Sequence, residues 1–195
     1  MDGFEKRKEQ KKESIRRAAL ELFQSYGFRK VSVSEIARKA GVSQVTIYNH
    51  FGSKEALVRD VLQWYSLSIL EKYEKTMTSE MPFLERLESI VFEKSEAIGQ
   101  FQGELLQAWI HDDPDMQAFV EDIYTNRVIP IIKTFFEEGL RQGYIDQRFS
   151  LETIIFYFEI IRRGFFAMPE LADKAEHDPA LIKGLLELMT YGLNG

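Results

Sequence analysis

The stretch that decides the fold is residues 32–54, SVSEIARKAGVSQVTIYNHFGSK. Ser32 and Glu35 have the spacing of a capping box, in which each side chain accepts a backbone N–H, and they predict a helix beginning at Val33. Gly41 ends that helix, because glycine adopts the left-handed conformation without steric cost. Ser43 is then the N-cap of a second helix over 44–51, which Gly52 ends. A third helix begins at Ser53.

Two short helices joined by a glycine turn form the layout that places the second helix in the major groove of DNA. Helical spacing puts Ile36, Ala37 and Ile47 on buried faces. The opposite face of the second helix carries Gln44, Val45, Tyr48 and Asn49. Amide side chains pair with an adenine edge, and a valine methyl contacts a thymine methyl. This face is therefore a candidate for reading base pairs.

Hydroxyl and basic side chains around the second helix are suited to phosphate oxygens, which set the register of a protein on DNA rather than its sequence preference. The candidates are Ser43, Thr46, Tyr48, His50 and Lys54. Three structural alternatives stand beside these roles. Ser43 is also a helix cap, Tyr48 also suits a core, and a single histidine such as His50 is more often a packing residue than a ligand.

The string IARKAGVSQVTIYNHFGSKEAL, residues 36–57, resembles the DNA-binding signature of the TetR family of bacterial transcriptional regulators. The similarity covers residues 15–62. Val45 departs from the family, which often has glycine there, and Ser34 is the hydroxyl residue favoured for the family's phosphate contact at the first motif helix. The resemblance implies a homodimeric regulator, a repressor released by a small-molecule effector, on a near-palindromic operator of double-stranded DNA.

Charge is distributed unevenly along the 195 residues. The net charge is −6, but residues 1–62 hold 13 Lys and Arg against 8 Asp and Glu, whereas residues 63–195 hold 12 against 23. A basic excess that coincides with the helical motif is what a phosphate-binding surface requires. The segment 6–17 is open to two interpretations, a solvated helix face rich in charge pairs or an arm lying near DNA.

The rest of the sequence predicts an all-α fold. An apolar stripe from Ile15 to Tyr26 indicates one helix, and caps and periodicity indicate others over 53–77, 82–98, 101–110, 114–139, 151–168 and 179–193. Pro130 is expected to kink or split the helix that contains it. We expect an N-terminal three-helix helix-turn-helix DNA-binding domain, residues 1–53, and a larger helical effector-binding and dimerisation domain, residues 54–195.

Apolar residues surround the predicted helices 151–168 and 179–193 on nearly every side, so each needs covering twice. The same pair from a second subunit supplies that cover in a four-helix bundle, and burial within one chain is the alternative. The family's pairing through its last two long helices favours the homodimer. The resemblance also implies an effector pocket, for which Phe101, Trp109, Tyr124 and Phe158 are the candidate lining residues, although core packing explains such aromatics equally.

Several classes of protein are disfavoured. The sequence has no cysteine and none of the common motifs of hydrolases, nucleotide-binding enzymes or zinc enzymes, so we expect neither an enzyme nor a metal or other cofactor. No apolar run is long enough to span a bilayer, and the N-terminus does not resemble a secretory signal, which favours a cytoplasmic protein. A helical ligand-binding or scaffold protein whose helix-turn-helix is only structural is the alternative function.

Overall fold

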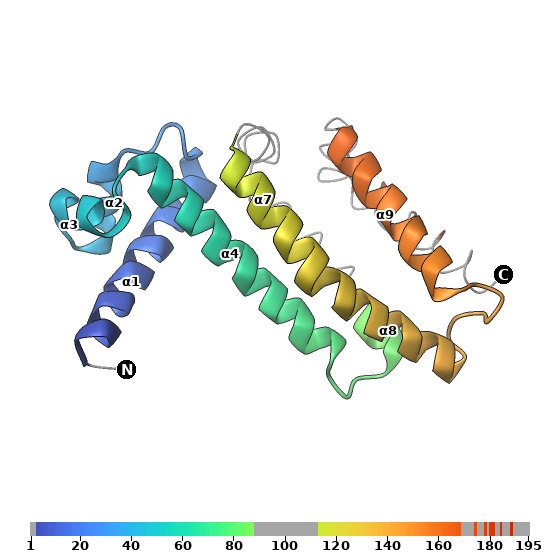
Figure 1. Cartoon of the computed structure of the whole chain (residues 1–195). Coiled ribbons are helices and arrows are strands. Elements are labelled where there is room, and N and C mark those ends of the chain that lie inside the picture. Colours follow the sequence, from blue (N-terminus) through green and yellow to red (C-terminus); the bar gives the residue numbers. More distant parts are fainter. Residues whose placement is uncertain are drawn as a thin grey trace. The chain divides into compact units, whose positions relative to one another are not determined.

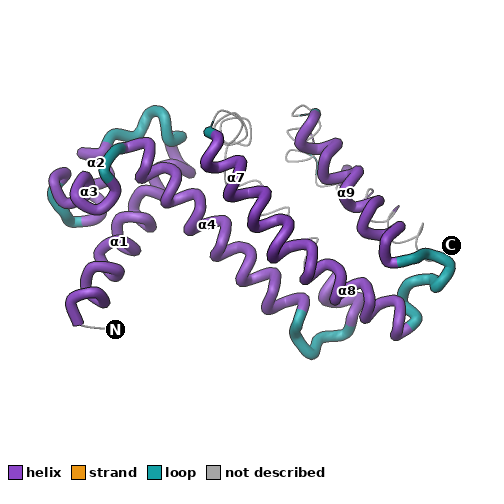
Figure 2. Tube along the Cα trace, viewed as in Figure 1, coloured by secondary structure: helices purple, strands orange, loops and turns teal. Residues whose placement is uncertain are grey.

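The computed structural model describes residues 3–87 and 113–168, together with Lys174, Asp178, Ala180, Leu181, Gly184 and Leu188. All regular secondary structure in these residues is helical (Figure 2), which confirms the all-α prediction. The chain forms two compact units, Met1–Ser68 and Ile69–Gly195. The functional boundary predicted after residue 53 stays a prediction, because compactness and function need not divide a chain at the same residue.

The first unit contains α1 (Gly3–Tyr26), α2 (Val33–Ala40), α3 (Gln44–Phe51) and the first part of α4 (Lys54–Met77) (Figure 1). Its core is built from small and branched apolar side chains that are fully buried, namely Ile15, Ala19, Ile36, Ile47, Leu57 and Val61. Tyr26, the last residue of the predicted apolar stripe, is instead 62% exposed, because α1 ends there and Gly27 turns the chain away with φ 76°.

An ion pair fixes α1 against α4 within this unit. The Arg16 guanidinium donates from Nε to Asp60 Oδ1 at 2.5 Å and from Nη2 to Asp60 Oδ2 at 3.1 Å. A two-pronged arginine–carboxylate contact fixes orientation as well as distance. The pair therefore sets the angle at which α1 crosses the start of α4.

The second unit contains α7 (Pro114–Ile123), the π-helical turn η1 (Tyr124–Val128), α8 (Ile129–Gln142) and α9 (Leu151–Ala167). Asp113 caps α7 and precedes its proline, with Oδ1 accepting from the N–H groups of Asp115 and Met116. The core of the unit is a cluster of Phe83, Phe135, Phe136, Ile145 and Ile154.

Pro130 does not split the predicted helix, because residues 114–142 are helical throughout. The chain inserts the η1 turn immediately before it, in which the N–H of Ile129 donates to the carbonyl of Tyr124, five residues back. A proline has no N–H, and its ring collides with the carbonyl four residues earlier in an α-helix. The wider turn relieves that collision, so α7 and α8 continue as one helical rod (Figure 1).

The predicted helix end at Gly139 is wrong, since α8 continues to Gln142 and Gly143, with φ 79°, caps it. Gly139 has a different role within the helix. A Cβ atom at this position would lie 2.6 Å from Cζ of Phe83, closer than carbon atoms approach. The glycine therefore lets the Phe83 ring pack directly on the backbone of α8.

Some of the other predicted helices lie among the residues that the structure describes, and some lie outside them. Residues 83–87 of the predicted helix 82–98 are helical, and α9 matches the predicted helix 151–168 to within a residue. Residues 88–98, the whole of 101–110 and most of 179–193 lie outside the described residues. Within the part of the chain that the structure describes, no helix is long and apolar enough to cross a membrane.

Candidate nucleic-acid interface

Helix α2 begins where the capping box predicts. The N–H of Ser32 donates to Glu35 Oε2 at 2.8 Å, and the N–H of Glu35 donates to Ser32 Oγ at 3.3 Å. The bonds from the Ser32 hydroxyl and N–H hold the pKa of the Glu35 carboxyl below its ordinary value. Ser34 is exposed beside this cap, with its Oγ 2.9 Å from Ser32 Oγ. Its hydroxyl is thus at the surface, as a phosphate contact requires.

The turn between α2 and α3 depends on Gly41. Its φ of 68° lies in the left-handed region, which suits glycine. The N–H groups of Gly41 and Val42 then donate back to the carbonyls of Arg38 and Ala37, at 3.3 and 3.0 Å, and complete the helix end. Because this turn is only a few residues long, it fixes α3 at one angle to α2.

Helix α3 presents one buried and one exposed side, as its sequence predicts. Ile47 has no exposed surface, whereas Val45 is 66% and Tyr48 is 46% exposed. Gln44 and Asn49 are exposed on the same helix. The exposure of Tyr48 rules out the alternative that it belongs to the core. The predicted base-reading residues Gln44, Val45 and Asn49 and the predicted phosphate donor Tyr48 are therefore available to a macromolecule outside the chain.

The predicted phosphate donors surround the start and end of α3. Ser43 Oγ accepts from the N–H of Thr46 at 3.0 Å and lies 2.8 Å from Thr46 Oγ1, so both hydroxyls meet at the first turn. Lys54, at the start of α4, donates from Nζ to the carbonyl of Arg29 at 3.3 Å. An ammonium group has three N–H donors, so this contact is compatible with a second one to a phosphate.

His50 is half-buried at the end of α3. Burial lowers the pKa of its imidazole, and the positive charges of Lys12, Lys11 and Lys8 on α1 lower it further. The sequence did not predict that α1 reaches this position, because residues 8–12 and 50 are far apart in the chain. The available signal was the spacing of Lys11 and Lys12, three and four residues after Lys8, which makes each a neighbour of Lys8 on the helix surface.

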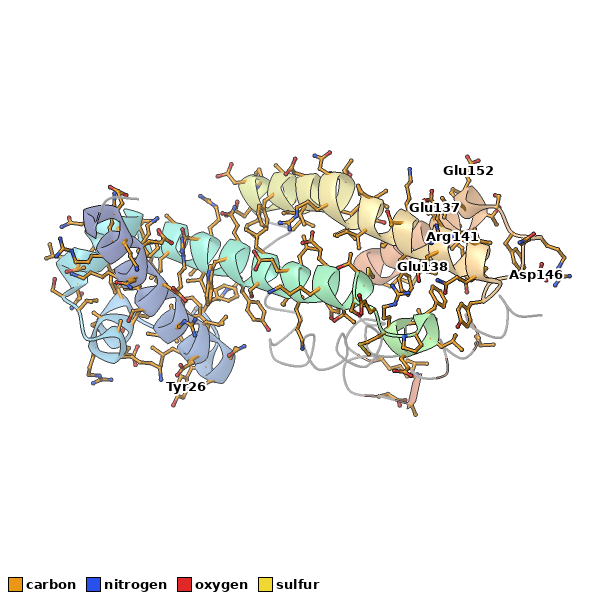
Figure 3. The ribbon with its side chains drawn as sticks, turned by 90° about the horizontal axis from the view of Figure 1, so that it is seen from below. Tyr26, Glu137, Glu138, Arg141, Asp146 and Glu152 are labelled. Atoms are coloured by element: carbon orange, nitrogen blue, oxygen red, sulfur yellow. The ribbon has the colours of Figure 1, made fainter. Side chains whose placement is uncertain are left out.

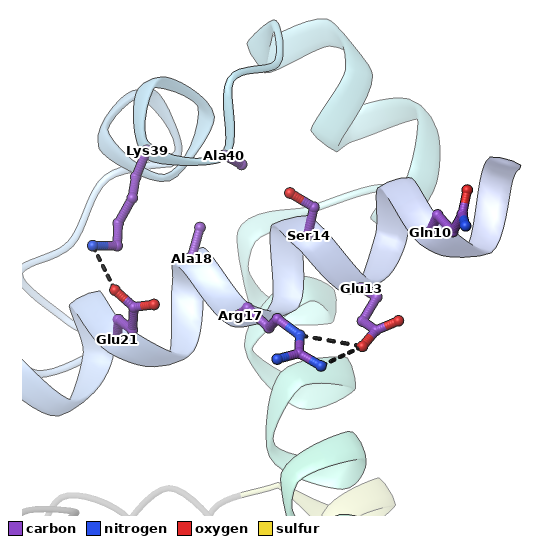
Figure 4. Close-up of a pocket in the computed structure, with 8 residues that line it drawn as sticks. All are labelled: Gln10, Glu13, Ser14, Arg17, Ala18, Glu21, Lys39 and Ala40. Atoms are coloured by element: carbon purple, nitrogen blue, oxygen red, sulfur yellow. Dashed lines mark hydrogen bonds and ion pairs between the residues drawn. The ribbon is translucent and has the colours of Figure 1, made fainter.

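A shallow hollow lies between α1 and α2 (Figure 4). Its charged walls are paired with each other: Arg17 Nη2 lies 2.6 Å from Glu13 Oε1, and Lys39 Nζ lies 2.6 Å from Glu21 Oε2. These pairs join neighbouring turns of α1 and tie α1 to α2. The hollow is therefore explained as part of the scaffold that supports α3.

The predicted effector-pocket residues are only partly described. Tyr124 lies half-buried in the η1 turn, while Phe158 lies on α9 with its side chain outside the described set. Phe101 and Trp109 fall outside the described residues. These four residues are consequently not brought together by the part of the chain that the structure describes, and their shared pocket stays a prediction.

An all-helical chain in which a glycine-turned helix pair presents Gln, Tyr and Asn outward has the architecture of a helix-turn-helix DNA-binding protein. Residues 15–61 match the family described as bacterial regulatory proteins, tetR family. These residues therefore match the DNA-binding region of the TetR family of transcriptional regulators. The match covers the C-terminal half of α1, all of α2 and α3, and the start of α4, the elements that position the candidate interface.

Curated transcriptional regulators match part of this chain. The chain is 34% identical over 80 residues to the transcriptional repressor KstR2 of Rhodococcus jostii, an alignment covering 41% of this chain and 39% of KstR2. It is 31% identical over 101 residues to the transcriptional regulator UidR of Escherichia coli, covering 51% of each. The chain thus spans about half, or less, of the length of the curated relatives it matches.

The similarity of fold extends further than that of sequence. The structure of the transcriptional regulator FadR from Bacillus subtilis in complex with stearoyl-CoA superposes with a TM-score of 0.63, at 20% identity, over 92% of this chain and 97% of FadR. At this identity the match shows a shared fold.

Proposed function

We propose that this chain is a sequence-specific DNA-binding transcriptional regulator, a repressor that a small-molecule effector releases from its operator. The observation that carries the proposal is the two-sided character of α3. Ile47 anchors the helix in the core while Gln44, Val45, Tyr48 and Asn49 face outward. Side chains of these types contact base edges and phosphates in the major groove.

A second copy of the chain completes the proposed DNA-binding particle. On α9, Ile154 is buried in the core of the second unit, while Phe156 is 66% and Ile160 is 54% exposed. A helix with apolar residues on both sides needs a second cover, and twofold pairing through residues 151–168 and 179–193 supplies it. Two α3 helices would then enter successive major grooves about 34–36 Å apart, on a near-palindromic operator.

The proposed effector site lies in residues 54–195, with Phe101, Trp109, Tyr124 and Phe158 as candidate lining residues. The FadR structure of the same fold holds stearoyl-CoA, which supports a ligand with a large apolar part. Binding of the effector would tilt α4 and change the separation of the two α3 helices. DNA and effector would then oppose each other through one coupling free energy, typically ~1–3 kcal/mol. Such a regulator would work in the cytoplasm, without catalysis or a cofactor.

The alternative is a ligand-binding or scaffold protein whose helix-turn-helix is only structural. A binding titration with fluorescent mixed-sequence duplex DNA, repeated at rising salt, separates the two functions. The regulator binds with an affinity that falls steeply with salt, because bound phosphates release counterions. Tyr48→Ala should weaken this binding, while Tyr26→Ala, which removes a still more exposed tyrosine from α1, should leave it unchanged. A wild-type protein that binds no duplex at low salt would support the alternative.

A further inference from the structure

Three lysines of α1 form a positive face beside the end of α3. Lys11 and Lys12 follow Lys8 by three and four residues, so each is a neighbour of Lys8 on the helix surface. Lys12 Nζ lies 5.5 Å from the centroid of the Phe51 ring, over the last residue of α3. We call these three residues the α1 lysine patch. It is joined to the candidate interface through the end of α3.

The acidic residues of α1 do not neutralise this patch. Glu9 pairs with Arg16, with Oε1 2.7 Å from Nη1, and Arg16 is itself held by Asp60. Glu13 pairs with Arg17, and Glu21 with Lys39. None of the patch lysines forms an ion pair with another residue that the structure describes. The carboxylates of Glu9, Glu13 and Glu21 are thus engaged elsewhere, which leaves the three lysines of the patch against Glu5, the remaining acidic residue of α1 that the structure describes.

The charges of the α1 lysine patch act on His50, near the end of α3. Its imidazole feels the charges of Lys12, Lys11 and Lys8, which disfavour protonation, while Glu9 is the one neighbour that favours it. The geometry agrees for Lys12, because its Nζ lies 5.5 Å from the ring of Phe51, the residue that follows His50. Three lysines and a histidine at the C-terminal end of α3 form a surface suited to an anion.

We propose that the α1 lysine patch binds the phosphate backbone of DNA beside the major groove that α3 enters. This inference rests on the proposed function of α3 and extends its footprint to a second helix. Lysines are flexible point charges, so they suit phosphates and carry no base preference. Residues 8 and 12 are about 6 Å apart along a helix axis, which lets neighbouring phosphates be contacted together. Of the two interpretations that the sequence left open for the segment 6–17, the proposal favours an arm lying near DNA.

The expected signature is a change in salt dependence. Each phosphate neutralised on B-DNA contributes about 0.9 to the slope of log affinity against log salt. Replacing Lys8, Lys11 and Lys12 together by glutamine should therefore flatten the slope by about 0.9 for each phosphate that the variant no longer neutralises, and by twice that if a twofold dimer binds. Affinity should fall equally for every DNA sequence, because bonds to the backbone do not discriminate between bases.

The experiment compares the triple variant K8Q/K11Q/K12Q with wild type on mixed-sequence duplex DNA across a salt series. The matched control is K75Q/K133Q/K174Q, which removes three exposed lysines of the second unit and changes the net charge equally. Circular dichroism and thermal unfolding verify that both variants fold. The proposal expects a flatter salt slope and weaker binding for the patch variant alone.

The outcomes separate this inference from the proposed function. If wild type binds DNA, Tyr48→Ala weakens binding and the patch variant keeps the wild-type slope, the inference is wrong and the function of α3 stands. If wild type binds no DNA, the proposed function fails and takes the inference with it. If the patch variant keeps its DNA slope but no longer binds vesicles of anionic phospholipid, the patch serves a membrane surface and the proposal is overturned.

Discussion

Arg86 and Glu138 join three helical segments of the second unit. The Arg86 guanidinium donates from both Nη1 and Nη2 to the Glu138 carboxylate, and Nη1 also donates to the carbonyl of Met77 at 2.6 Å. Arg86 is 3% exposed, and Glu138 projects from α8 beside Glu137 (Figure 3). The carbonyl of Met77 is at the C-terminus of α4, where backbone acceptors lack helical partners. One arginine thus ties the end of α4 to α8.

Glu138→Gln should destabilise the protein. It removes the negative charge opposite a buried guanidinium whose Nε already lacks a hydrogen-bond partner among the residues that the structure describes. Leaving a buried charge without its counter-ion is costly, and because the Glu138 side chain is 23% exposed we expect about 2–3 kcal/mol. Urea unfolding measures this destabilisation. Glu137→Gln, which removes the same charge one residue away at an exposed position, should change the free energy of unfolding by less than about 0.5 kcal/mol.

The same pair gives stability a defined pH dependence. The hydrogen bonds from Arg86 hold the pKa of Glu138 below its ordinary value of 4.5. A carboxyl with a lowered pKa in the folded state stabilises the protein above pH 4.5, and that contribution disappears as the pH falls through the folded-state pKa. Wild type should therefore lose stability in acid more steeply than Glu138→Gln. Parallel pH profiles for the two proteins would contradict the assignment.

Ser43 has a structural role and a proposed DNA-binding role, which two substitutions separate. Ser43→Ala removes the acceptor for the N–H of Thr46 and should cost about 1 kcal/mol of stability as well as DNA affinity. Ser43→Asp keeps an N-cap oxygen but places a negative charge at the proposed phosphate contact. It should therefore retain stability and bind DNA more weakly, in measurements of unfolding and of duplex affinity. Wild-type affinity for both variants would leave Ser43 a cap only.

DNA binding should involve proton uptake at His50. Burial and the charges of Lys12, Lys11 and Lys8 lower its pKa in the free protein below 6.5. A nearby phosphate favours the protonated imidazole, so affinity should rise as the pH falls from 7 through the region below 6.5, and His50→Gln should abolish that rise.

NMR titration of the His50 ring tests the arrangement without DNA. Its pKa should increase in K8Q/K11Q/K12Q, because three charges that disfavour protonation are gone, and should be unchanged in K75Q/K133Q/K174Q. An unchanged value in the patch variant would mean that α1 does not lie beside the end of α3.

The proposed dimer can be broken on α9. Phe156→Glu places a charge on the exposed apolar side of the helix, and sedimentation should show a monomer where wild type is a dimer. Thr134→Glu adds the same charge to the exposed surface of α8 and should leave the dimer intact. If wild type itself sedimented as a monomer, the proposal that a second subunit covers the exposed apolar side of α9 would be wrong.

Local sequence signals predicted the candidate interface well. The bounds of α2 and α3 follow from Ser32, Gly41, Ser43 and Gly52, because caps and left-handed glycines act on their immediate neighbours. Sequence reasoning failed where the role of a residue depends on a contact with another residue far away in the chain. Gly139 reads as a helix end, but the Phe83 ring, 56 residues earlier in the chain, requires a glycine inside the helix.

Two further features needed the three-dimensional arrangement. Pro130 predicts a disturbance of the helix but not its form, and the chain accommodates it with a π turn. Lys8, Lys11 and Lys12 share a face by their spacing, but only the packing of α1 shows that this face meets His50. Side chains far apart in sequence are brought together by tertiary contacts that periodicity does not encode.

The most direct test of the account is the sequence preference of the wild-type protein, selected from a random duplex library, compared with that of Gln44→Ala. We predict that wild type enriches an inverted repeat with half-sites about one DNA turn apart. Gln44→Ala should lose discrimination at one position in each half-site and keep the others. Enrichment of no sequence by wild type, or the same base preferences from both proteins, would contradict the assignment of α3 as the helix that reads DNA.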